Sequence, residues 1–289
     1  MEYVILISAI VFSVSQTFIR KGFADKYKSG VFAFSFWYSI VAAVAFIILA
    51  AVKGTLVFSL STLPYALMFA AAYGTTLISG TLVYKYGPLA LSSLIGSYSL
   101  LIPTFYGAVF EKAPLTVFIW IGLVLFAVSL FLTNYKKGAD NEKKISIKWI
   151  VFLVISFISN GLCSVFQRLE QTNVPSQYSD TFMIEALLIA SAVIAAASFI
   201  SENKNDRVSV TKGALCPAAL CGVSNAIVNA AVMFLNNRSF PTAVMFPVIS
   251  AGGIVIIFIA SVTFFKEKMS PLQVIGFVLG ILSIIFFNL

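Results

Sequence analysis

Ten apolar stretches, each long enough to cross a membrane as a helix, dominate this sequence. A helix that crosses a hydrocarbon layer of about 30 Å needs ~20 residues. The chain of 289 residues is 60% hydrophobic and 10% charged, whereas soluble domains are about 45–50% apolar and about 25% charged. We therefore expect an all-α membrane protein. The predicted spans cover residues 3–19, 31–52, 63–83, 89–110, 115–133, 149–166, 179–200, 214–234, 242–265 and 272–287.

Three short motifs in the first half of the chain recur in the second half in the same order. A charged segment, residues 135–148, separates the two sets. Ordered recurrence at nearly constant spacing favours a duplicated unit, so we expect a first repeat over residues 1–134 and a second over residues 149–289. The motif pairs are Ser13-Val14-x-Gln16 with Ser164-Val165-x-Gln167, Pro88-x-Ala90-Leu91 with Pro241-x-Ala243-Val244, and Glu111-Lys112 with Glu267-Lys268.

The number of spans in each repeat determines how the repeats face each other. After five crossings the chain starts its second repeat from the opposite side of the membrane. We therefore expect ten transmembrane helices arranged as two inverted five-helix repeats. In such proteins, binding sites lie at the interface between the repeats, near the membrane midplane.

Lysine and arginine residues concentrate in alternate loops. The odd-numbered loops carry fifteen of these bases and the even-numbered loops carry four. The positive-inside rule then predicts that the odd loops are cytoplasmic and that both termini lie outside. The net charge of +8 follows from this topology, and we expect no nucleic-acid partner. Arg20 and Lys21 follow the first apolar stretch, where a cleaved signal would have small residues, so we expect this stretch to remain as a span.

The sequence lacks the groups that most enzymes and pumps require. Histidine is absent, which removes imidazole acid–base chemistry and histidine metal ligands. Cys163, Cys216 and Cys221 have no CxxC spacing and are typical of buried apolar positions. No loop carries the glycine-rich pattern of a nucleotide-binding P-loop. We therefore expect no enzymatic activity and no cofactor, and we expect energy from protons, another gradient or an exchanged solute.

Taken together, these features resemble the drug/metabolite transporter superfamily in its EamA-like ten-span branch. The resemblance rests on ten spans in two halves, on the Glu-Lys-x-Pro-Leu boundary at residues 111–115 with a looser partner at Glu267, and on the glycine-bearing final span of each half. The segment around Ser13 is also similar to the first helix of four-span small multidrug resistance transporters. The resemblance implies a secondary transporter of small organic molecules, with a cavity lined by the first, third and fourth spans of each half.

The sequence departs from these relatives in two ways. The four-span transporters carry a membrane glutamate at the position of Ser13, so their coupling chemistry does not carry over. Members of the ten-span branch usually keep both termini in the cytoplasm, which is the opposite of what the loop charges predict here.

Polar residues inside the spans are candidates for substrate contact, because an unpaired polar group in hydrocarbon is costly. Asn225 and Asn229 share one helix face, and their pattern fits substrate binding and interhelical hydrogen bonding equally well. Trp37 and Tyr38 follow the basic first loop, which favours an interfacial aromatic belt. The predicted substrate-binding residues are Gln16, Tyr73, Thr76, Ser97, Tyr98, Asn160, Asn225, Asn229 and Ser250.

Glu185 is the acid that lies most clearly within an apolar stretch. It could be a protonatable coupling site or the counter-charge of a cationic substrate, but a structural ion pair with Arg168 or a loop base is favoured. We expect Asp180 to be solvated. Ser13 and Gln167 complete the predicted coupling and gating set, and we interpret the arginines beside Gln16 and Gln167 as snorkelling to a membrane face.

The sequence therefore predicts a secondary active transporter that moves a small organic metabolite across the cytoplasmic membrane by alternating access, in the export direction. Three alternatives remain open: an uptake carrier, a flippase for a lipid-linked substrate, and a receptor or scaffold without transport activity. Polar residues at equivalent depths in both repeats favour a carrier over a scaffold. We expect a monomer or a homodimer in contact with lipid.

Overall fold

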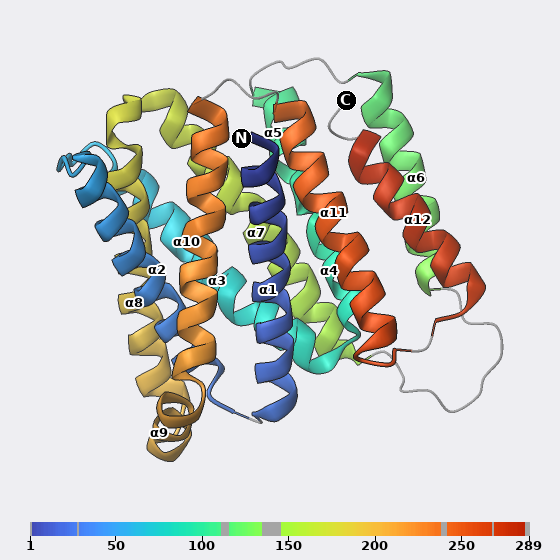
Figure 1. Cartoon of the computed structure of the whole chain (residues 1–289), viewed down its shortest axis with the longest axis horizontal. Helices are drawn as coiled ribbons and strands as arrows, with labels where there is room; N and C mark the ends of the chain where they lie inside the picture. The colour runs from blue at the N-terminus through green and yellow to red at the C-terminus, as the bar shows by residue number, and fades with distance from the viewer. Residues whose placement is uncertain are drawn as a thin grey trace.

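The described part of the chain is helical and contains no strand (Figure 1). The computed structural model describes residues 2–27, 29–110, 116–134, 146–237, 242–267 and 269–286. The elements are α1 (Glu2–Lys26), α2 (Val31–Lys53), α3 (Leu63–Tyr86), α4 (Leu89–Ser97), the 3-10 turn η1 (Tyr98–Leu100), α5 (Leu101–Phe110), α6 (Val117–Asn134), α7 (Ile147–Asn173), the 3-10 turn η2 (Ser176–Tyr178), α8 (Ser179–Ser201), α9 (Lys204–Gly213), α10 (Leu215–Asn237), α11 (Thr242–Thr263) and α12 (Pro271–Phe286).

Seven helices in the described residues are long and apolar enough to cross a membrane. Three shorter apolar helices, Val117–Thr133, Val248–Thr263 and Pro271–Phe286, fall on the remaining predicted spans. The expectation of a multi-pass, all-helical membrane protein is confirmed. Ten crossings in two inverted repeats stay a prediction. The motif at residues 111–115 and most of the charged segment 135–148 lie outside the described residues.

Each helix of the first predicted repeat packs against helices of the second. α2 contacts α8, α6 contacts α12, and α4 contacts α11. α3 packs on α7, and α1 packs on α10. By order in the two predicted repeats, α1 corresponds to α7, α2 to α8, α3 to α10, α4 to α11 and α6 to α12. The contact of α1 with α10 therefore has its counterpart in the contact of α7 with α3, and the other three contacts join corresponding helices. Both termini lie at the same end of the bundle (Figure 1), as an even number of crossings requires.

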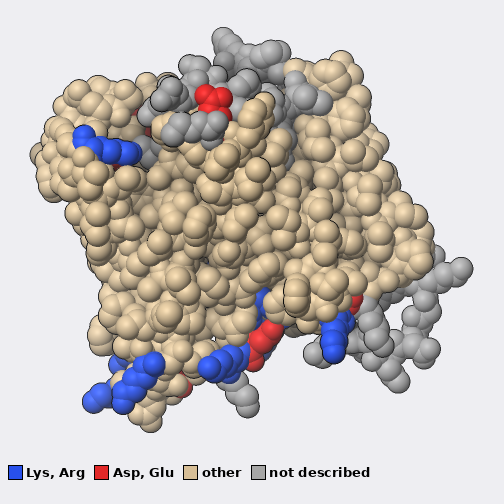
Figure 2. Space-filling model, viewed as in Figure 1, with Lys and Arg blue, Asp and Glu red and all other residues tan. Residues whose placement is uncertain are grey.

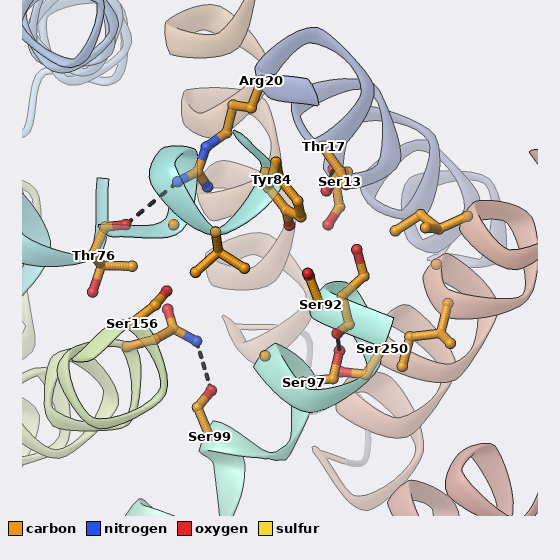
Figure 3. Close-up of a pocket in the computed structure, with 18 of the residues that line it drawn as sticks. Ser13, Thr17, Arg20, Thr76, Tyr84, Ser92, Ser97, Ser99, Ser156 and Ser250 are labelled. Atoms are coloured by element: carbon orange, nitrogen blue, oxygen red, sulfur yellow. Dashed lines mark hydrogen bonds between the residues drawn. The ribbon is translucent and has the colours of Figure 1, made fainter. Parts of the chain in front are cut away.

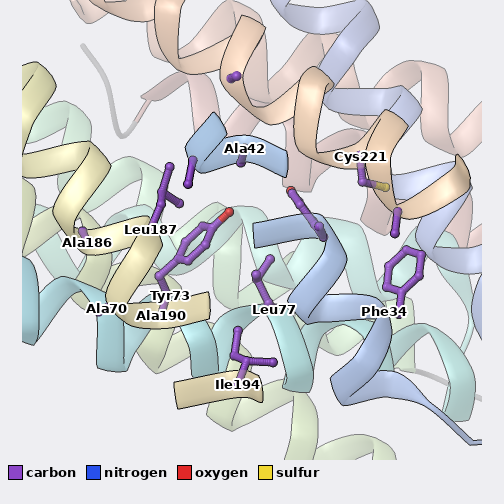
Figure 4. Packing of buried hydrophobic residues seen from close by; sticks show 14 of the residues in the cluster. Phe34, Ala42, Ala70, Tyr73, Leu77, Ala186, Leu187, Ala190, Ile194 and Cys221 are labelled. Carbon is purple, nitrogen blue, oxygen red and sulfur yellow. The ribbon is translucent and has the colours of Figure 1, made fainter. Parts of the chain in front are cut away.

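The largest apolar core joins α2, α3, α8 and α10 (Figure 4). Phe34, Leu187 and Ile194 are at most 1% exposed. Small residues let the helices approach closely: a Cβ atom on Gly222 of α10 would lie 2.6 Å from the carbonyl oxygen of Tyr38 on α2. Glycine at this position therefore sets the spacing of α2 and α10.

Most lysine and arginine side chains in the view of Figure 2 gather at one end of the molecule, which we call the basic face. This end holds the loops between α1 and α2, α3 and α4, and α11 and α12, the start of α7, and helix α9. The opposite face carries the loop after α2 and the end of α7. Bases of the basic face are Lys21, Lys26, Lys85, Lys148, Lys204, Arg207, Lys212 and Lys266, whereas Lys53 and Arg168 lie on the opposite face.

Candidate functional site

A cavity of about 270 Å³ lies between helices of both predicted repeats. Its walls come from α1, α3, α4 and η1 of the first repeat and from α7 and α11 of the second. Figure 3 shows hydroxyl side chains around the space, with Arg20 at one edge. They include Ser13, Thr17, Ser93, Ser97, Ser156 and Ser250.

The cavity lies nearer to the basic face than to the opposite face. Its lining includes Tyr84 in the last turn of α3 and Ser92 in the first turn of α4. Arg20 lies within the last two turns of α1, and Leu153 lies within the first two turns of α7. All four helix ends belong to the basic face.

A break in the fourth predicted span positions part of the lining. Pro103 has no N–H to donate to the carbonyl of Ser99, and η1 separates α4 from α5 just before it. The freed carbonyl oxygen of Ser99 faces Gly161 of α7, where a Cβ atom would lie 2.8 Å from it. Asn160 Nδ2 donates a hydrogen bond to Ser99 Oγ at 2.6 Å. The break thus brings Ser97, Ser99 and Asn160 to the cavity.

Arg20 is the only charged residue in the described lining. Its Nε donates to Thr81 Oγ1 at 3.2 Å, and its Nη2 donates to the carbonyl oxygens of Thr76 at 3.3 Å and Leu77 at 3.1 Å. Among the described residues, no acidic side chain forms an ion pair with it. These bonds hold the guanidinium against α3 at the cavity wall. The expectation that Arg20 snorkels to the membrane face was therefore wrong.

The second half of the chain matches a known protein family. Residues 147–289 match the model of the EamA-like transporter family. The second half of the chain belongs to that family. The EamA-like family is part of the drug/metabolite transporter superfamily, and the match suggests a membrane transporter of this type.

Comparison of the whole chain with solved structures gives information on its fold. Twenty-eight solved chains match it. One, titled only "Crystal structure of protein", has a TM-score of 0.55 and covers 99% of this chain and 96% of its own at 13% sequence identity. At this identity the match shows a shared fold over nearly the full length. No curated protein matches the chain.

The cavity uses most of the spans that the EamA-like resemblance predicts. The first, third and fourth spans contribute α1, α3 and α4 with η1, and the sixth and ninth contribute α7 and α11. The eighth span, α10, contributes no residue to the described lining. The predicted site residues Ser13, Thr76, Ser97, Asn160 and Ser250 line the cavity, and their role in binding or gating stays a prediction.

Four other predicted residues form a second polar cluster between α1, α2, α3 and α10. The hydroxyl of Tyr38 donates to Gln16 Oε1, and the hydroxyl of Tyr73 donates to Asn225 Oδ1 at 3.4 Å. Asn229 Nδ2 donates to the carbonyl oxygen of Asn225 at 2.9 Å. Tyr38 is 2% exposed, so its assignment to an interfacial belt was wrong. None of these side chains is in the described lining of the cavity.

Two further predicted residues lie away from the cavity. The hydroxyl of Tyr98 donates to Ser129 Oγ at 3.4 Å, and the ring lies against Gly280 of α12, where a Cβ atom would be 2.6 Å from the hydroxyl. Gln167 is half-buried in the last turns of α7. It is therefore near the opposite face, far along α7 from Asn160.

The acidic residues of α8 also lie near the opposite face. Glu185 Oε2 accepts a hydrogen bond from the hydroxyl of Thr62 at 2.8 Å, and no base pairs with it in the described residues. Asp180 is buried, with a carboxylate oxygen 2.6 Å from Thr55 Oγ1 and another 3.9 Å from Lys53 Nζ. The expectation that Asp180 is solvated was wrong, because α8 packs this first turn against the end of α2.

Arg20 and Ser93 line the cavity but are not among the residues predicted for the site. Ser13, Thr17 and Arg20 have the spacing of one helix face, so a polar stripe on α1 was visible in the sequence. Ser93 Oγ is buried and has no hydrogen-bond partner in the described part of the chain, a property that only the packing reveals. The described residues contain no group of three or more acidic or cysteine side chains able to hold a metal ion.

Proposed function

We propose that this EamA-like protein is a secondary transporter that exports a small organic metabolite across the cytoplasmic membrane by alternating access. The observation that carries the proposal is the hydroxyl-lined cavity between helices of both halves in an otherwise apolar bundle. A polar space of this kind is costly in a membrane protein unless a ligand or water uses it. A scaffold would gain nothing from it.

Apolar contacts lie next to the cavity in the bundle. Toward the opposite face, Leu6 of α1 packs with Leu235 of α10 and with Ile249, which also lines the cavity. Phe18, which lies between the lining residues Thr17 and Arg20 on α1, packs with Phe265 at a ring separation of 6.1 Å. The cluster around Leu6 is a suitable gate for alternating access, because its separation would open the cavity toward the opposite face.

Export is the direction that we propose, with loading from the basic face. The cavity lies near the basic face, and the positive-inside rule assigns that face to the cytoplasm. A metabolite would then bind from the cytoplasm and leave after the cluster around Leu6 opens.

Reconstituted protein tests this proposal. Liposomes that contain the protein should release a preloaded labelled metabolite from a broad panel faster than protein-free liposomes. Gly96 lines the cavity, and a Cβ atom there would meet nothing within 4 Å, so Gly96→Leu should fill the cavity and reduce the flux at least ~10-fold. Gly22→Leu is the matched control, because Gly22 also has free space and lies outside the lining.

Two results would contradict the transporter proposal. The first is the absence of flux for every member of the panel in active, correctly folded preparations. The second is a flux that Gly96→Leu and Gly22→Leu change equally. Uptake by right-side-out vesicles without release from inside-out loading would support an importer instead.

A further inference from the structure

The described lining of the cavity contains one positive charge and no negative charge. We propose that the cavity binds a small carboxylate monoanion that also carries hydroxyl groups, with Arg20 as the charge partner of the carboxylate. This inference rests on the transport function proposed above and names its substrate class.

Arg20 keeps donors available for a ligand. Its Nε and Nη2 atoms are engaged with α3, whereas no described residue accepts a hydrogen bond from Nη1. A guanidinium carries five N–H donors, two of them on Nη1. Charge-assisted bonds from such donors to a carboxylate are among the strongest hydrogen bonds in proteins. The arginine is thus fixed on one edge and free on the other.

The position of the Arg20 guanidinium depends on a glycine of α3. A Cβ atom on Gly80 would lie 2.4 Å from Nη2 and 3.3 Å from Cζ of Arg20. The ring of Tyr84 lies on another side of the guanidinium, with its centroid 5.5 Å from Cζ. Gly80 and Tyr84 both line the cavity. Any side chain at position 80 would push the guanidinium out of its present place.

A second observation also indicates a polar ligand. Ser93 lines the cavity, is 8% exposed, and its hydroxyl has no hydrogen-bond partner in the described residues. The start of α4 beside it offers no free anion site, because Glu267 accepts hydrogen bonds from the backbone N–H groups of Leu89 at 2.6 Å and Ala90 at 3.4 Å. Ligand hydroxyl groups are the partners that Ser93 and its hydroxyl neighbours can satisfy.

Charge balance selects a monoanion. One guanidinium neutralises one negative charge, so a phosphate dianion would leave excess charge in a low-dielectric site. The ammonium group of an amino acid would meet no carboxylate in the described lining. The volume of about 270 Å³ is at the small end of ligand sites. These facts together favour a hydroxylated carboxylate of a few carbon atoms.

Thermal shift and equilibrium binding with purified full-length protein test the inference. The probes are D-glycerate and D-gluconate, with glycerol and sorbitol as neutral partners of similar size. We expect at least one carboxylate to bind and stabilise the protein, and neither polyol to do so. Arg20→Gln should weaken carboxylate binding by roughly 10- to 100-fold. Lys26→Gln removes an exposed charge at the same end of α1 but outside the lining, and should change binding less than ~2-fold.

A second variant keeps the test valid if Arg20→Gln does not fold. Gly80→Ala retains the arginine but displaces its guanidinium, so it should also weaken carboxylate binding by ~10-fold. Gly22→Ala is its control. Phosphate-bearing and amino-bearing analogues, 3-phosphoglycerate and L-serine, should bind more weakly than glycerate.

The outcomes separate this inference from the transport proposal. Flux of a neutral or cationic solute without carboxylate binding would overturn the anion site and leave transport intact. Carboxylate binding that needs Arg20, without flux of any solute, would support the site and overturn transport. Binding of neither carboxylate, equal binding of the bound carboxylate to the wild type and to Arg20→Gln, or equal stabilisation by that carboxylate and its neutral partner would overturn the inference.

Discussion

Charged side chains on the long helices differ in how their charge is compensated. Arg20 donates to three acceptors on α3, and Glu185 accepts from the hydroxyl of Thr62. Glu170 of α7 is different: it is 1% exposed, and neither carboxylate oxygen has a hydrogen-bond partner in the described residues. A buried polar group without a partner costs roughly 1–3 kcal/mol, and more when it is charged.

Replacing Glu170 by methionine should therefore stabilise the protein. Glu170→Met keeps a similar volume and removes the unpartnered carboxylate, so we expect the melting temperature in detergent to rise by about 2–4 °C. Glu185→Gln is the control and should lower it, because Thr62 loses a charged acceptor. A melting temperature of Glu170→Met at or below that of the wild type would show that the carboxylate has a stabilising partner.

Sequence could predict residue types in the cavity better than residue positions. Ser97 and Asn160 were accessible as polar residues in apolar stretches, and both line the cavity. The role of Arg20 was not accessible, because it depends on space at Gly80 and on an acceptor at Thr81, which lie on α3 and are distant in sequence. From the sequence alone, Asn225 and Asn160 were equally good candidates for the cavity. Only the packing of the helices shows that Asn160 lines it and Asn225 does not.

At the scale of elements, the length of each apolar stretch predicted the bounds of those helices that end where the sequence changes from apolar to polar. The predicted span 31–52 corresponds to α2, Val31–Lys53, and the span 63–83 to α3, Leu63–Tyr86. Helix α7 continues beyond its predicted end at residue 166 to Asn173, because its last turns are polar and carry no hydropathy signal. Helix α9 was not predicted either, because its residues are mostly polar or charged and give no hydropathy signal. Its Val210 packs on Gly30, whose φ of +87° and lack of a Cβ atom permit the contact.

Two carboxylates of the second half cap helices of the first half at the basic face. Glu267, which was visible in the sequence only as a repeated motif, accepts from the first N–H groups of α4. Glu202 accepts from the N–H groups of Phe32 at 2.8 Å and Ala33 at 3.1 Å at the start of α2. Carboxylates stabilise helix N-termini by satisfying free donors and by favourable interaction with the helix dipole.

Glu267→Gln should loosen the start of α4 locally. The glutamine amide keeps one acceptor oxygen but loses the charge, so we expect the start of α4 to lose about 1 kcal/mol of stability. Hydrogen–deuterium exchange should speed up in residues 89–93 and stay unchanged in residues 31–35. Glu202→Gln should give the reverse pattern. Faster exchange in both segments with either variant would mean that the two caps act through global stability.

At the scale of the whole molecule, the distribution of bases predicts the topology. Loops on the basic face should be cytoplasmic by the positive-inside rule. Cysteines introduced at Lys204 and Lys53 report the two faces, in a background where the exposed Cys216 is replaced by serine. A membrane-impermeant maleimide added to intact cells should label Lys53→Cys and spare Lys204→Cys until the membrane is permeabilised. Labelling of Lys204→Cys alone in intact cells would invert the topology and the proposed direction of transport.

The symmetric helix contacts and the apolar cluster of Leu6 and Leu235 lead to a prediction about motion. If transport requires the cluster of Leu6 and Leu235 to separate, a link between α1 and α10 at this point should block it. Both residues are buried, at 4% and 0% exposure, in one apolar cluster. Leu6→Cys combined with Leu235→Cys, in a protein whose Cys216 is replaced by serine, should therefore lose flux when treated with a short thiol cross-linker.

The link should affect transport and binding differently, because the cavity lies on the side of this cluster toward the basic face. A cross-linked protein should retain gluconate binding within ~2-fold of the reduced protein, while its flux falls at least ~10-fold. Each single cysteine variant, treated with the same reagent, should keep its flux. With a disulfide in place of the linker, a reductant should restore transport. Full flux in the cross-linked protein would show that the solute passes without separation of α1 and α10, and the two halves would then not open at this cluster.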